Sequence, residues 1–481
     1  MFLGLDLGTS AVKAILVGAD GAVITSHAVP LSVSRPHQGW SEQDADSWWQ
    51  AADHAVRQLR QTHPRHLAAV KAIGLSGQMH GLTALDSAMR PLRPAILWND
   101  TRSAAQAASL DKSDPAFRSI GGNAVMPGFT APKAVWMAEC EPALFASIEM
   151  ILLPKDYLRL RMTGEAVSEM SDAAGTLWLD VAARDWSDTL LGLCGLDRTQ
   201  MPRLVEGNAV SGQLRDEIAR DWGIDGNPVV AGGGGDNAAA AVGLGTVLPG
   251  DSFLSLGTSG VVFTVTESFA PAAASGAHAF CHALPDTWHQ MGVILAASDC
   301  VSWLCEVTGT DVDILMQDLA ATDPAATDPM FHPYLSGERT PHNDASARGG
   351  FFGLARDHGR GEMTRAVLQG VAFAIADATQ VLAEAGGAPE RLLATGGGAK
   401  NRTWLSYIAS VTGIPIDLPA DGDFGAALGA ARLGMMADGA GIADVCHKPD
   451  IRMTISPDAG LADRLGKARA RWRHLYQLVR G

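Results

Sequence analysis

Residues 3–17 read LGLDLGTSAVKAILV, and this stretch decides the fold that we expect. An apolar strand runs into the turn Gly8-Thr9-Ser10, and a second apolar strand leads away from it. Asp6 precedes the turn, where its carboxylate can face a ligand held there. Gly8 lets the backbone approach such a ligand closely, and Thr9, Ser10 and the turn amides offer donors for phosphate oxygens. Taken alone, the stretch also fits an ordinary hairpin.

The hairpin has a partial repeat half a chain later, at residues 253–265, which read FLSLGTSGVVFTV. An apolar strand again meets a Gly-Thr-Ser turn, formed here by Gly257, Thr258 and Ser259, and another apolar strand follows. Internal repetition indicates an architecture built from related units. The sequence therefore predicts two similar halves that face each other across a nucleotide.

The length and composition of the chain fit this two-part α/β plan. A chain of 481 residues is too long for one core, and we expect two domains, residues 1–245 and 246–481. A hydrophobic content of 47% with 19% charged residues is typical of a globular protein. The net charge of −15 argues against a nucleic-acid partner. It does not exclude an anionic nucleotide, because backbone amides and Mg²⁺ can neutralise phosphates locally.

Cysteine usage and the lack of targeting signals predict a cytoplasmic protein. The six cysteines form no C-x-x-C pair and no zinc-like cluster, which favours reduced thiols. The first strand begins at residue 2 without a basic segment or a cleavage site, so we expect no signal peptide. No apolar run reaches about 18 residues without a charge, so we expect no membrane span.

A first group of candidate ligand-binding residues follows the buried-type strand at residues 69–76. Polar groups at strand ends in α/β folds commonly face ligand crevices. Gln78 and His80 can hydrogen-bond hydroxyl groups, and Met79 can pack against a carbon skeleton. The alternative for His80 is a structural histidine with satisfied hydrogen bonds.

A second group is WNDTR at residues 98–102. The face of Trp98 with its polar neighbours suits a small polyol. Asp100 and Arg102 could equally form a structural ion pair.

The most pointed acid is Asp236, which follows four glycines at residues 232–235 and starts an Ala-rich helix. Glycines after a strand let a helix N-terminus approach a ligand, and amide donors there favour an ionised carboxylate. Asp236 would alternatively be a simple helix cap. A cap does not require four preceding glycines, so we favour a role in the site. Residues 245–250 then resemble a hinge between the halves.

The second half carries a similar strand-glycine-helix pattern at residues 396–401, GGGAKN. Gly397 and Gly398 would let a planar base or a phosphate lie against the backbone, and Asn401 is expected to begin the next helix. His278, His282 and His289 have mixed spacing that matches no clear metal site, so we expect structural roles for them. The loop YLSGERTPH at residues 334–342 has no single obvious chemical meaning.

Together these elements resemble the FGGY carbohydrate kinases, and among them most closely the xylulokinases, over nearly the whole chain. Seven motifs in the family's order carry the resemblance. They are DLGTS at 6–10, SGQMHG at 76–81, WNDTR at 98–102, GGGGDNAA at 232–239, SLGTSGVV at 255–262, YLSGERTPH at 334–342 and GGGAKN at 396–401. The resemblance implies an actin-like ATPase fold, with two ribonuclease-H-like domains around a central cleft. It also implies transfer of the γ-phosphoryl group of Mg-ATP to the 5-hydroxyl of D-xylulose.

The resemblance further implies roles for individual residues. Asp236 corresponds to the family's general base and Asp6 to the acid near Mg²⁺ and the phosphates. Met79 and His80 match the sugar-contacting pair, and Asn237 joins them. On residue chemistry, Gln78 and Trp98 complete the expected substrate set. The expected ATP-binding residues are Thr9, Ser10, Gly257, Thr258 and Ser259 for the phosphates, and Gly397, Gly398 and Asn401 for the adenosine end.

Two other functions are compatible with parts of this pattern. The nearer one is a kinase of the same family for another ketose, polyol or sugar acid. The other is a non-kinase with the same ATP-binding architecture, such as an actin-like filament protein or a chaperone ATPase domain. QMHG, WNDTR and the acid after the four glycines argue against the second. A sugar and ATP are thus the expected partners, without nucleic acid or membrane, and a homodimer is left open.

Overall fold

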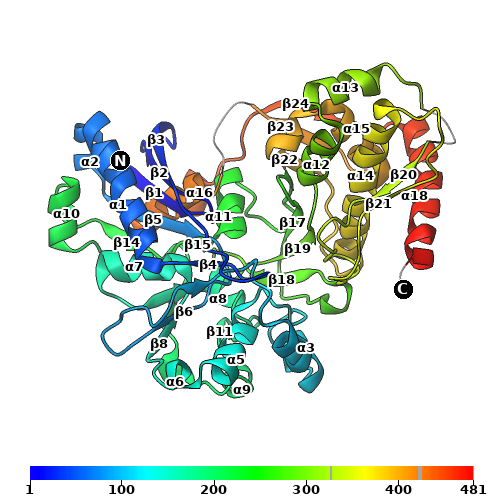
Figure 1. Ribbon diagram of the computed structural model, residues 1–481. Helices are drawn as coiled ribbons and strands as arrows, with labels where there is room; N and C mark the ends of the chain where they lie inside the picture. Colours follow the sequence, from blue (N-terminus) through cyan, green and yellow to red (C-terminus); the bar gives the residue numbers. More distant parts are fainter. Residues whose placement is uncertain (325–327, 421–424, 480–481) are drawn as a thin grey trace.

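The computed structural model describes residues 1–324, 328–420 and 425–479, which form two α/β lobes (Figure 1). Within these residues, each lobe is built on a seven-stranded mixed sheet. The first sheet has the order β13-β14-β5-β1-β2-β3, with β15 also paired to β5. Its strands are β1 (Phe2–Leu7), β2 (Ala11–Val17), β3 (Val23–Pro30), β5 (Ala72–Gly77), β13 (Val210–Gln213), β14 (Val229–Ala231) and β15 (Gly234–Gly235).

The sheet of the second lobe has the order β18-β19-β17-β16-β22-β23-β24. Its strands are β16 (Ser252–Leu256), β17 (Gly260–Thr266), β18 (His278–Cys281), β19 (Trp288–Ile294), β22 (Leu392–Thr395), β23 (Ile416–Pro419) and β24 (Ile451–Ile455). In both sheets an antiparallel hairpin lies beside two parallel strands, β1–β2 beside β5 and β14, and β16–β17 beside β22 and β23. The repeat predicted from the two Gly-Thr-Ser turns is therefore a repeat of sheet topology.

Helices cover the central strands, which are mostly apolar. Every residue of β5 is buried, as expected for a parallel strand covered on both faces. The helices of the first half are α1 (Ala45–Thr62), α2 (Pro64–Ala68), α3 (Ala104–Ser113), α4 (Ala116–Ser119), α5 (Thr130–Cys140), α6 (Pro142–Phe145), α7 (Pro154–Thr163), α8 (Met170–Ala174), α9 (Asp188–Gly192), α10 (Asp216–Trp222) and α11 (Asp236–Leu244). Short strand pairs complete this half: β4 (Glu42–Gln43) with β7 (Ala95–Ile96), β6 (Thr83–Leu85) with β8 (Met150–Leu152), β9 (Val167–Glu169) with β12 (Arg203–Val205), and β10 (Leu179–Asp180) with β11 (Asp185–Trp186).

The second half of the chain contributes further helices, most of them around its own sheet. They are α12 (Ser298–Thr308), α13 (Val312–Ala320), α14 (Arg360–Glu384), α15 (Arg402–Thr412), α16 (Ala426–Ala437), α17 (Ile442–Val445) and α18 (Ala459–Val479), with the strand pair β20 (Met330–His332) and β21 (Gly350–Phe352). Among the described residues, α14 is the one helix long and apolar enough to cross a membrane by length and composition. It lies in the second lobe, where 83% of its most apolar window is buried.

One helix of the second half packs in the first lobe. In Figure 1, α16 lies beside β1, β5 and α11, away from the strands that precede and follow it. Small residues make this contact, because a Cβ atom added to Gly74 would lie 1.6 Å from the carbonyl oxygen of Ala430. A Cβ atom added to Gly429 would lie 1.7 Å from the carbonyl oxygen of Ala239 on α11. The chain thus crosses between the lobes more than once, and the predicted division at residue 245 stays a prediction.

Helix caps show where local sequence signals hold. Asn401 caps α15 as predicted, because its side chain accepts a hydrogen bond from the Trp404 amide at 3.0 Å. Two short polar residues, Ser41 and Asp44, precede α1, and Asp44 caps that helix by accepting from the Asp46 amide at 3.0 Å. Both carry a short polar side chain suited to capping, and only Asp44 stands directly before the helix.

Candidate active site

A cavity of about 180 Å³ lies between the lobes and collects most of the predicted sugar-binding residues. From the first half, Met79, His80, Trp98, Met126, Gly128, Phe129, Asp236 and Asn237 line it. From the second half, Ser259, Val261, His278, Phe280, Met291, Val293 and Arg339 complete the lining. The structure therefore brings three features together: the strand-end motif (residues 76–81), the acid after the four glycines, and the second Gly-Thr-Ser turn.

Asp236 is the first residue of α11, with Gly235 in the capping position, so capping is not the role of its side chain. Its Oδ1 accepts hydrogen bonds from the amide of Asn237 at 2.7 Å and from the Asn237 side chain at 2.9 Å. These donors favour the ionised form, as predicted. Burial and the nearby charge of Asp6 outweigh them and raise the pKa of Asp236 to about 6. Asp236 is thus mostly ionised at neutral pH, with a pKa suited to accepting a proton.

Asp6 lies near the carboxyl end of β1 and is close enough to Asp236 to raise its pKa. Among the described residues, no group of three His, Cys, Asp or Glu side chains is arranged to hold a metal ion. Mg²⁺ does not require such a group, because it is usually bound by one or two carboxylates together with waters and substrate phosphates. A single carboxylate beside a phosphate-type turn fits that manner of binding.

His80 is fixed in one orientation and one tautomer. Its backbone has a positive φ of 67°, and its Nδ1 lies 2.7 Å from the carbonyl oxygen of Gly175. Because that oxygen can only accept, Nδ1 carries the proton and Nε2 is left as an acceptor. Burial lowers the pKa of His80 to about 3, so the ring stays neutral. A neutral imidazole with a free acceptor nitrogen in the cavity is suited to a sugar hydroxyl.

Met79 packs against Gly235, which precedes the acid, and against Gly175, which follows α8. A Cβ atom added to Gly235 would lie 2.9 Å from Cγ of Met79, and one added to Gly175 would lie 2.9 Å from its Cε. The methionine therefore fills the space that a side chain at position 175 or 235 would need. This contact fixes the distance between the strand-end motif and the start of α11.

Gln78 does not reach the cavity, and its predicted substrate contact is not supported. It is 2% exposed and forms hydrogen bonds with two residues of its own lobe. Its Oε1 accepts from the Thr9 hydroxyl at 2.8 Å, and its Nε2 donates to Oε1 of Gln43 at 3.0 Å. Gln43 in turn donates to the carbonyl oxygen of Thr9 at 2.8 Å. Gln78 thus holds the first Gly-Thr-Ser turn instead of a ligand.

Trp98 contacts both the cavity and the first turn. It lines the cavity, and its Nε1 donates to the Thr9 hydroxyl at 2.9 Å. That hydroxyl already donates its one proton to Gln78, so it has no proton left for a phosphate oxygen. In the first turn, only the Ser10 side chain and the backbone are then open to a phosphate, and Ser10 is exposed. Farther along the WNDTR motif, Asp100 and Arg102 form a buried ion pair at 2.7 Å, which confirms the structural alternative for these two.

In the second turn, the carbonyl oxygens point away from the cavity. The carbonyl of Gly257 accepts from the Ser298 amide at 3.0 Å, and that of Thr258 accepts from the Ala297 amide at 2.8 Å. Thr258 is exposed and Ser259 lines the sugar-sized cavity. The turn therefore joins the start of α12 to the cavity that holds Asp236.

A second cavity of about 730 Å³ lies in the second lobe and brings together Gly397, Gly398 and Asn401. Side chains of α12, α13 and α15 form its other walls, including Met316 and Tyr407. A Cβ atom added to Gly398 would lie 2.9 Å from each of Leu256 Cβ, Ser298 Oγ and Trp404 Cζ3. Glycine is thus required where this loop passes the end of β16. The volume and the partly apolar walls suit an adenosine group.

A buried charge cluster beneath the four glycines was not predicted. It consists of Lys155, Asp156, Arg159, Glu169 and Asp172, all with fully buried side chains. Arg159 donates to the carbonyl oxygen of Gly232, and the Ser171 hydroxyl accepts from the Gly235 amide at 3.0 Å while donating to Glu169. Both ends of the glycine loop before Asp236 are thereby fixed. The four glycines in the sequence predicted the loop, but no local sequence feature predicted the charge cluster that supports it.

His278 is buried and lines the cavity, where its ring nitrogens contact Asn123 and Arg339, so the structural role expected for it stays a prediction. His282 and His289 lie outside this lining and are buried. Arg339 from the YLSGERTPH loop also reaches the cavity, although no function was predicted for it. Both residues lie more than 150 positions from the strand-end motif, and only the docking of the lobes brings them to it.

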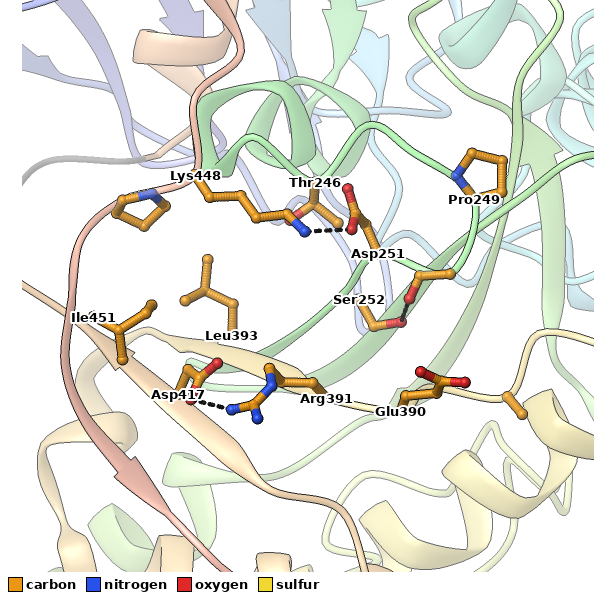
Figure 2. Close-up of a pocket in the computed structure, with 13 residues that line it drawn as sticks. Thr246, Pro249, Asp251, Ser252, Glu390, Arg391, Leu393, Asp417, Lys448 and Ile451 are labelled. Carbon is orange, nitrogen blue, oxygen red and sulfur yellow. Dashed lines mark hydrogen bonds and ion pairs between the residues drawn. The ribbon is translucent and has the colours of Figure 1, made fainter. Parts of the chain in front are cut away.

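A third cavity, of about 510 Å³, lies away from these residues, where the segment around Asp251 passes the segment around Lys448 (Figure 2). Four of its charged side chains form two ion pairs. Lys448 Nζ lies 2.5 Å from Asp251 Oδ1, and Arg391 Nη1 lies 2.7 Å from Asp417 Oδ1. This cavity therefore marks a junction between the lobes and not a second catalytic centre.

Comparisons with known proteins agree with this geometry. Residues 1–243 match the model of the N-terminal domain of the FGGY family of carbohydrate kinases, and residues 253–437 match its C-terminal domain. The xylulose kinase of Escherichia coli (strain K12) is 49% identical over 480 residues, covering 99% of each chain. That of Klebsiella pneumoniae is 51% identical over 438 residues, covering 91% of this chain and 90% of the relative.

Among solved structures, a crystal structure described as a xyloylose kinase from Brucella ovis superposes with a TM-score of 0.97. It is 52% identical and covers 100% of this chain and 99% of its own. The fold is accordingly the actin-like ATPase fold of sugar kinases. Because the two domain models match most of the chain and the relatives are similar over nearly all of it, the chain belongs to the FGGY family of carbohydrate kinases.

Proposed function

We propose that this kinase transfers the γ-phosphoryl group of ATP to the 5-hydroxyl of D-xylulose. The observation that carries the proposal is the joint placement of Asp236, His80 and Ser259 around one small cavity between the lobes. The relatives named xylulose kinase, similar over nearly their whole length, support the choice of sugar. A cavity of about 180 Å³ suits a small sugar and is too small for a nucleotide.

Asp236 acts as the general base in this proposal. Its carboxylate orients the 5-hydroxyl and accepts its proton while a bond forms between that oxygen and the γ-phosphorus. The bond from the γ-phosphorus to the bridging oxygen breaks, and ADP leaves. Phosphoryl transfer passes through a loose transition state, so positioning and charge neutralisation carry most of the catalysis. A pKa of about 6 leaves Asp236 ionised at neutral pH.

His80 and Met79 hold the sugar. The Nε2 acceptor of His80 receives a hydroxyl proton, and Met79 and Trp98 pack against the carbon chain. Asn237, whose amide is already oriented by Asp236, offers its remaining polar atoms to the sugar.

The two turns and the glycine loop hold the nucleotide. Backbone amides of residues 9–10 and 257–259 would face the phosphates, and Gly397, Gly398 and Asn401 lie along the adenosine cavity. Mg²⁺ bound with ATP would neutralise phosphate oxygens, and Asp6 is the residue that would hold it.

The test is release of ADP with Mg-ATP, measured without sugar and then with D-xylulose, D-ribulose, L-ribulose, glycerol and gluconate. We expect strong stimulation by D-xylulose, with phosphorus NMR showing the product phosphate coupled to the protons at carbon 5. Stimulation by another sugar alone would overturn the substrate and keep the kinase chemistry. ATP binding without transfer to any of these acceptors would overturn the proposed function as a whole.

A further inference from the structure

Arg339 is a charged side chain in the sugar-sized cavity that the catalytic steps above do not use. It comes from the loop between β20 and β21 of the second half, and it shares the cavity with His80 and Asp236 of the first. A guanidinium group stays charged in proteins and offers five N–H donors in a plane, without any acceptor. It therefore matches an oxygen atom that accepts hydrogen bonds.

A chain of hydrogen bonds across the two halves fixes Arg339. Its Nη1 donates to Nε2 of His278 at 3.2 Å, and Nδ1 of His278 lies 2.8 Å from Oδ1 of Asn123. The Asn123 Nδ2 group donates to the carbonyl oxygens of Gly121 and Ala279, so Oδ1 is the acceptor end of this amide. His278 thus carries its proton on Nδ1 and accepts from Arg339 on Nε2. Each donor and acceptor in the chain is determined.

The guanidinium group of Arg339 forms no ion pair in the parts of the chain that the structure describes, and its side-chain hydrogen bond goes to His278. The nearest carboxylate whose charge acts on it is that of Glu338, and this carboxylate accepts from the backbone amides of Leu295 and Arg339. Leaving the other donors of a largely enclosed cation unpaired is costly. A cation held in place by a neutral histidine and opening into a cavity is instead arranged to bind a ligand oxygen.

Arg339 lies beside a cluster of rings that forms part of the cavity wall, since its Nη1 bonds His278 directly. The rings of His278 and Phe280 stack at 5.4 Å, and Phe129 lies between His80 and His278 at ring distances of 4.7 and 5.7 Å. Arg339 therefore stands with this ring cluster, while Asp236 stands with the phosphate-binding turns.

The chemistry of a 2-ketopentose explains what Arg339 and the neighbouring rings must recognise. Such a sugar closes to a five-membered ring through its 5-hydroxyl, so a kinase acting on that hydroxyl must bind the open chain. The open chain carries a free carbonyl at carbon 2, whose oxygen only accepts hydrogen bonds. In a polyol the same position is a hydroxyl, whose proton would need an acceptor. Near Arg339 the Nε2 acceptor of His278 is already occupied.

Resting on the proposed function, we propose that Arg339 binds the carbonyl end of the open-chain ketose. It thereby selects a ketose over the corresponding polyol, and His278 and Asn123 position its guanidinium.

The experiment compares D-xylulose with xylitol, its 2-hydroxy analogue, in the wild type, Arg339→Gln and Arg339→Lys. Arg348→Gln is the matched control, because Arg348 lies on the same loop and is exposed. The wild type should prefer D-xylulose by about 10- to 100-fold in kcat/KM, the range expected when a buried polar group loses its partner. Arg339→Gln should lower kcat/KM for D-xylulose by a similar factor and leave that for xylitol within about threefold. Arg339→Lys keeps the charge and should recover part of the preference.

The variants must unfold at the wild-type temperature within a few degrees, and Arg339→Lys remains informative if Arg339→Gln does not fold. Equal losses for D-xylulose and xylitol, or a preference unchanged in both Arg339 variants, would overturn the proposal for Arg339 while the wild-type activity stands. A wild type inactive towards D-xylulose would overturn the proposed function itself, and the two failures are thus distinguished.

Discussion

The two Gly-Thr-Ser turns occupy equivalent places in the two sheets and have different surroundings. Asp6 stands two residues before the first turn, and Ser255 stands two residues before the second. The Thr9 hydroxyl is tied to Gln78 and Trp98, whereas Thr258 is exposed. The same local structure thus carries a carboxylate in one half and none in the other.

The contrast continues on the neighbouring parallel strands. In the first sheet Asp6 lies opposite Ser76 and Leu7 opposite Gly77, and in the second Ser255 lies opposite Thr395. By this register, Gln78 and Met79 correspond to Gly397 and Gly398. The first half therefore places large side chains where the second half places glycines. A small sugar needs contacts from side chains, and a nucleotide needs a smooth backbone, so one scaffold serves two ligands through the residues after the same strand.

The largest expected effect concerns Asp236, the proposed general base, which the first half contributes to the cavity. Asp236→Asn keeps the size and the hydrogen bonds of the side chain but cannot accept the hydroxyl proton. We expect kcat to fall by at least about 100-fold, the lower range for general-base assistance. ADP release measures turnover, and calorimetry with D-xylulose measures binding.

Sugar binding within a few-fold of the wild type is expected in Asp236→Asn. Asn237→Asp is a useful comparison, because it adds a carboxylate one position away and should not restore turnover when combined with Asp236→Asn. A kcat near that of the wild type in Asp236→Asn would remove Asp236 from this role.

A second prediction replaces a residue of the nucleotide half by its counterpart from the sugar half. Gly398→Met places a side chain where even a Cβ atom would lie 2.9 Å from three neighbours. Overpacking of this kind costs about 1–3 kcal/mol. We expect the KM for ATP to rise about tenfold or more, while the KM for D-xylulose changes less.

Gly397→Ala is the matched control for Gly398→Met, because a Cβ atom at Gly397 meets nothing within 4 Å. It should change the KM for ATP only slightly. Equal effects of the two substitutions would contradict the close approach at Gly398.

A third prediction uses the charge that distinguishes the first turn. Asp6 raises the pKa of Asp236, so Asp6→Asn should lower that pKa from about 6 toward its ordinary value. Because the base must be ionised, kcat/KM falls as the pH drops through this pKa. The acid limb of the profile should therefore move to lower pH in Asp6→Asn, on top of a lower maximal rate.

Ser255→Ala tests the equivalent position of the second turn and should leave the acid limb in place. The measurement is kcat/KM for D-xylulose from pH 4.5 to 8 at saturating ATP. If the acid limb of the profile does not move in Asp6→Asn, the charge of Asp6 does not influence the pKa of Asp236.

Much of the fold was predictable from the sequence because its signals are local. The two hairpins, the strand-glycine-helix patterns and the cap at Asn401 each depend on a few consecutive residues. The course of α16 was not predictable, since a helix of small residues can pack closely on either sheet. Its contacts with Gly74 and Ala239 depend on which lobe the chain returns to.

The site was predictable to a similar depth. Met79, His80, Trp98, Asp236 and Asn237 meet in one cavity as expected. Gln78 lies outside the lining of this cavity, and sequence does not reveal which way a polar side chain turns at a strand end. The placement of Arg339 and His278 in the cavity was missed because it comes from the docking of two lobes. A histidine on an apolar strand has no local feature that distinguishes a cavity wall from a core.

The smallest expected effect lies where the two halves are joined, at the ion pair of Lys448 and Asp251 (Figure 2). Asp251 also accepts from the amides of Val247 and Leu248, at 3.2 and 3.0 Å, so it orders the segment that follows α11. The side chain of Lys448 is 60% exposed, and a pair of this kind contributes about 0.2–1 kcal/mol. A double-mutant cycle of Lys448→Ala and Asp251→Asn should give a coupling in that range, decreasing with added salt. Asp251→Asn alone should destabilise more than Lys448→Ala, because the amide oxygen is a weaker acceptor for the two backbone N–H groups. If the two single variants were equally stable, the carboxylate would serve the lysine alone, and the link between the halves would depend on packing around α16.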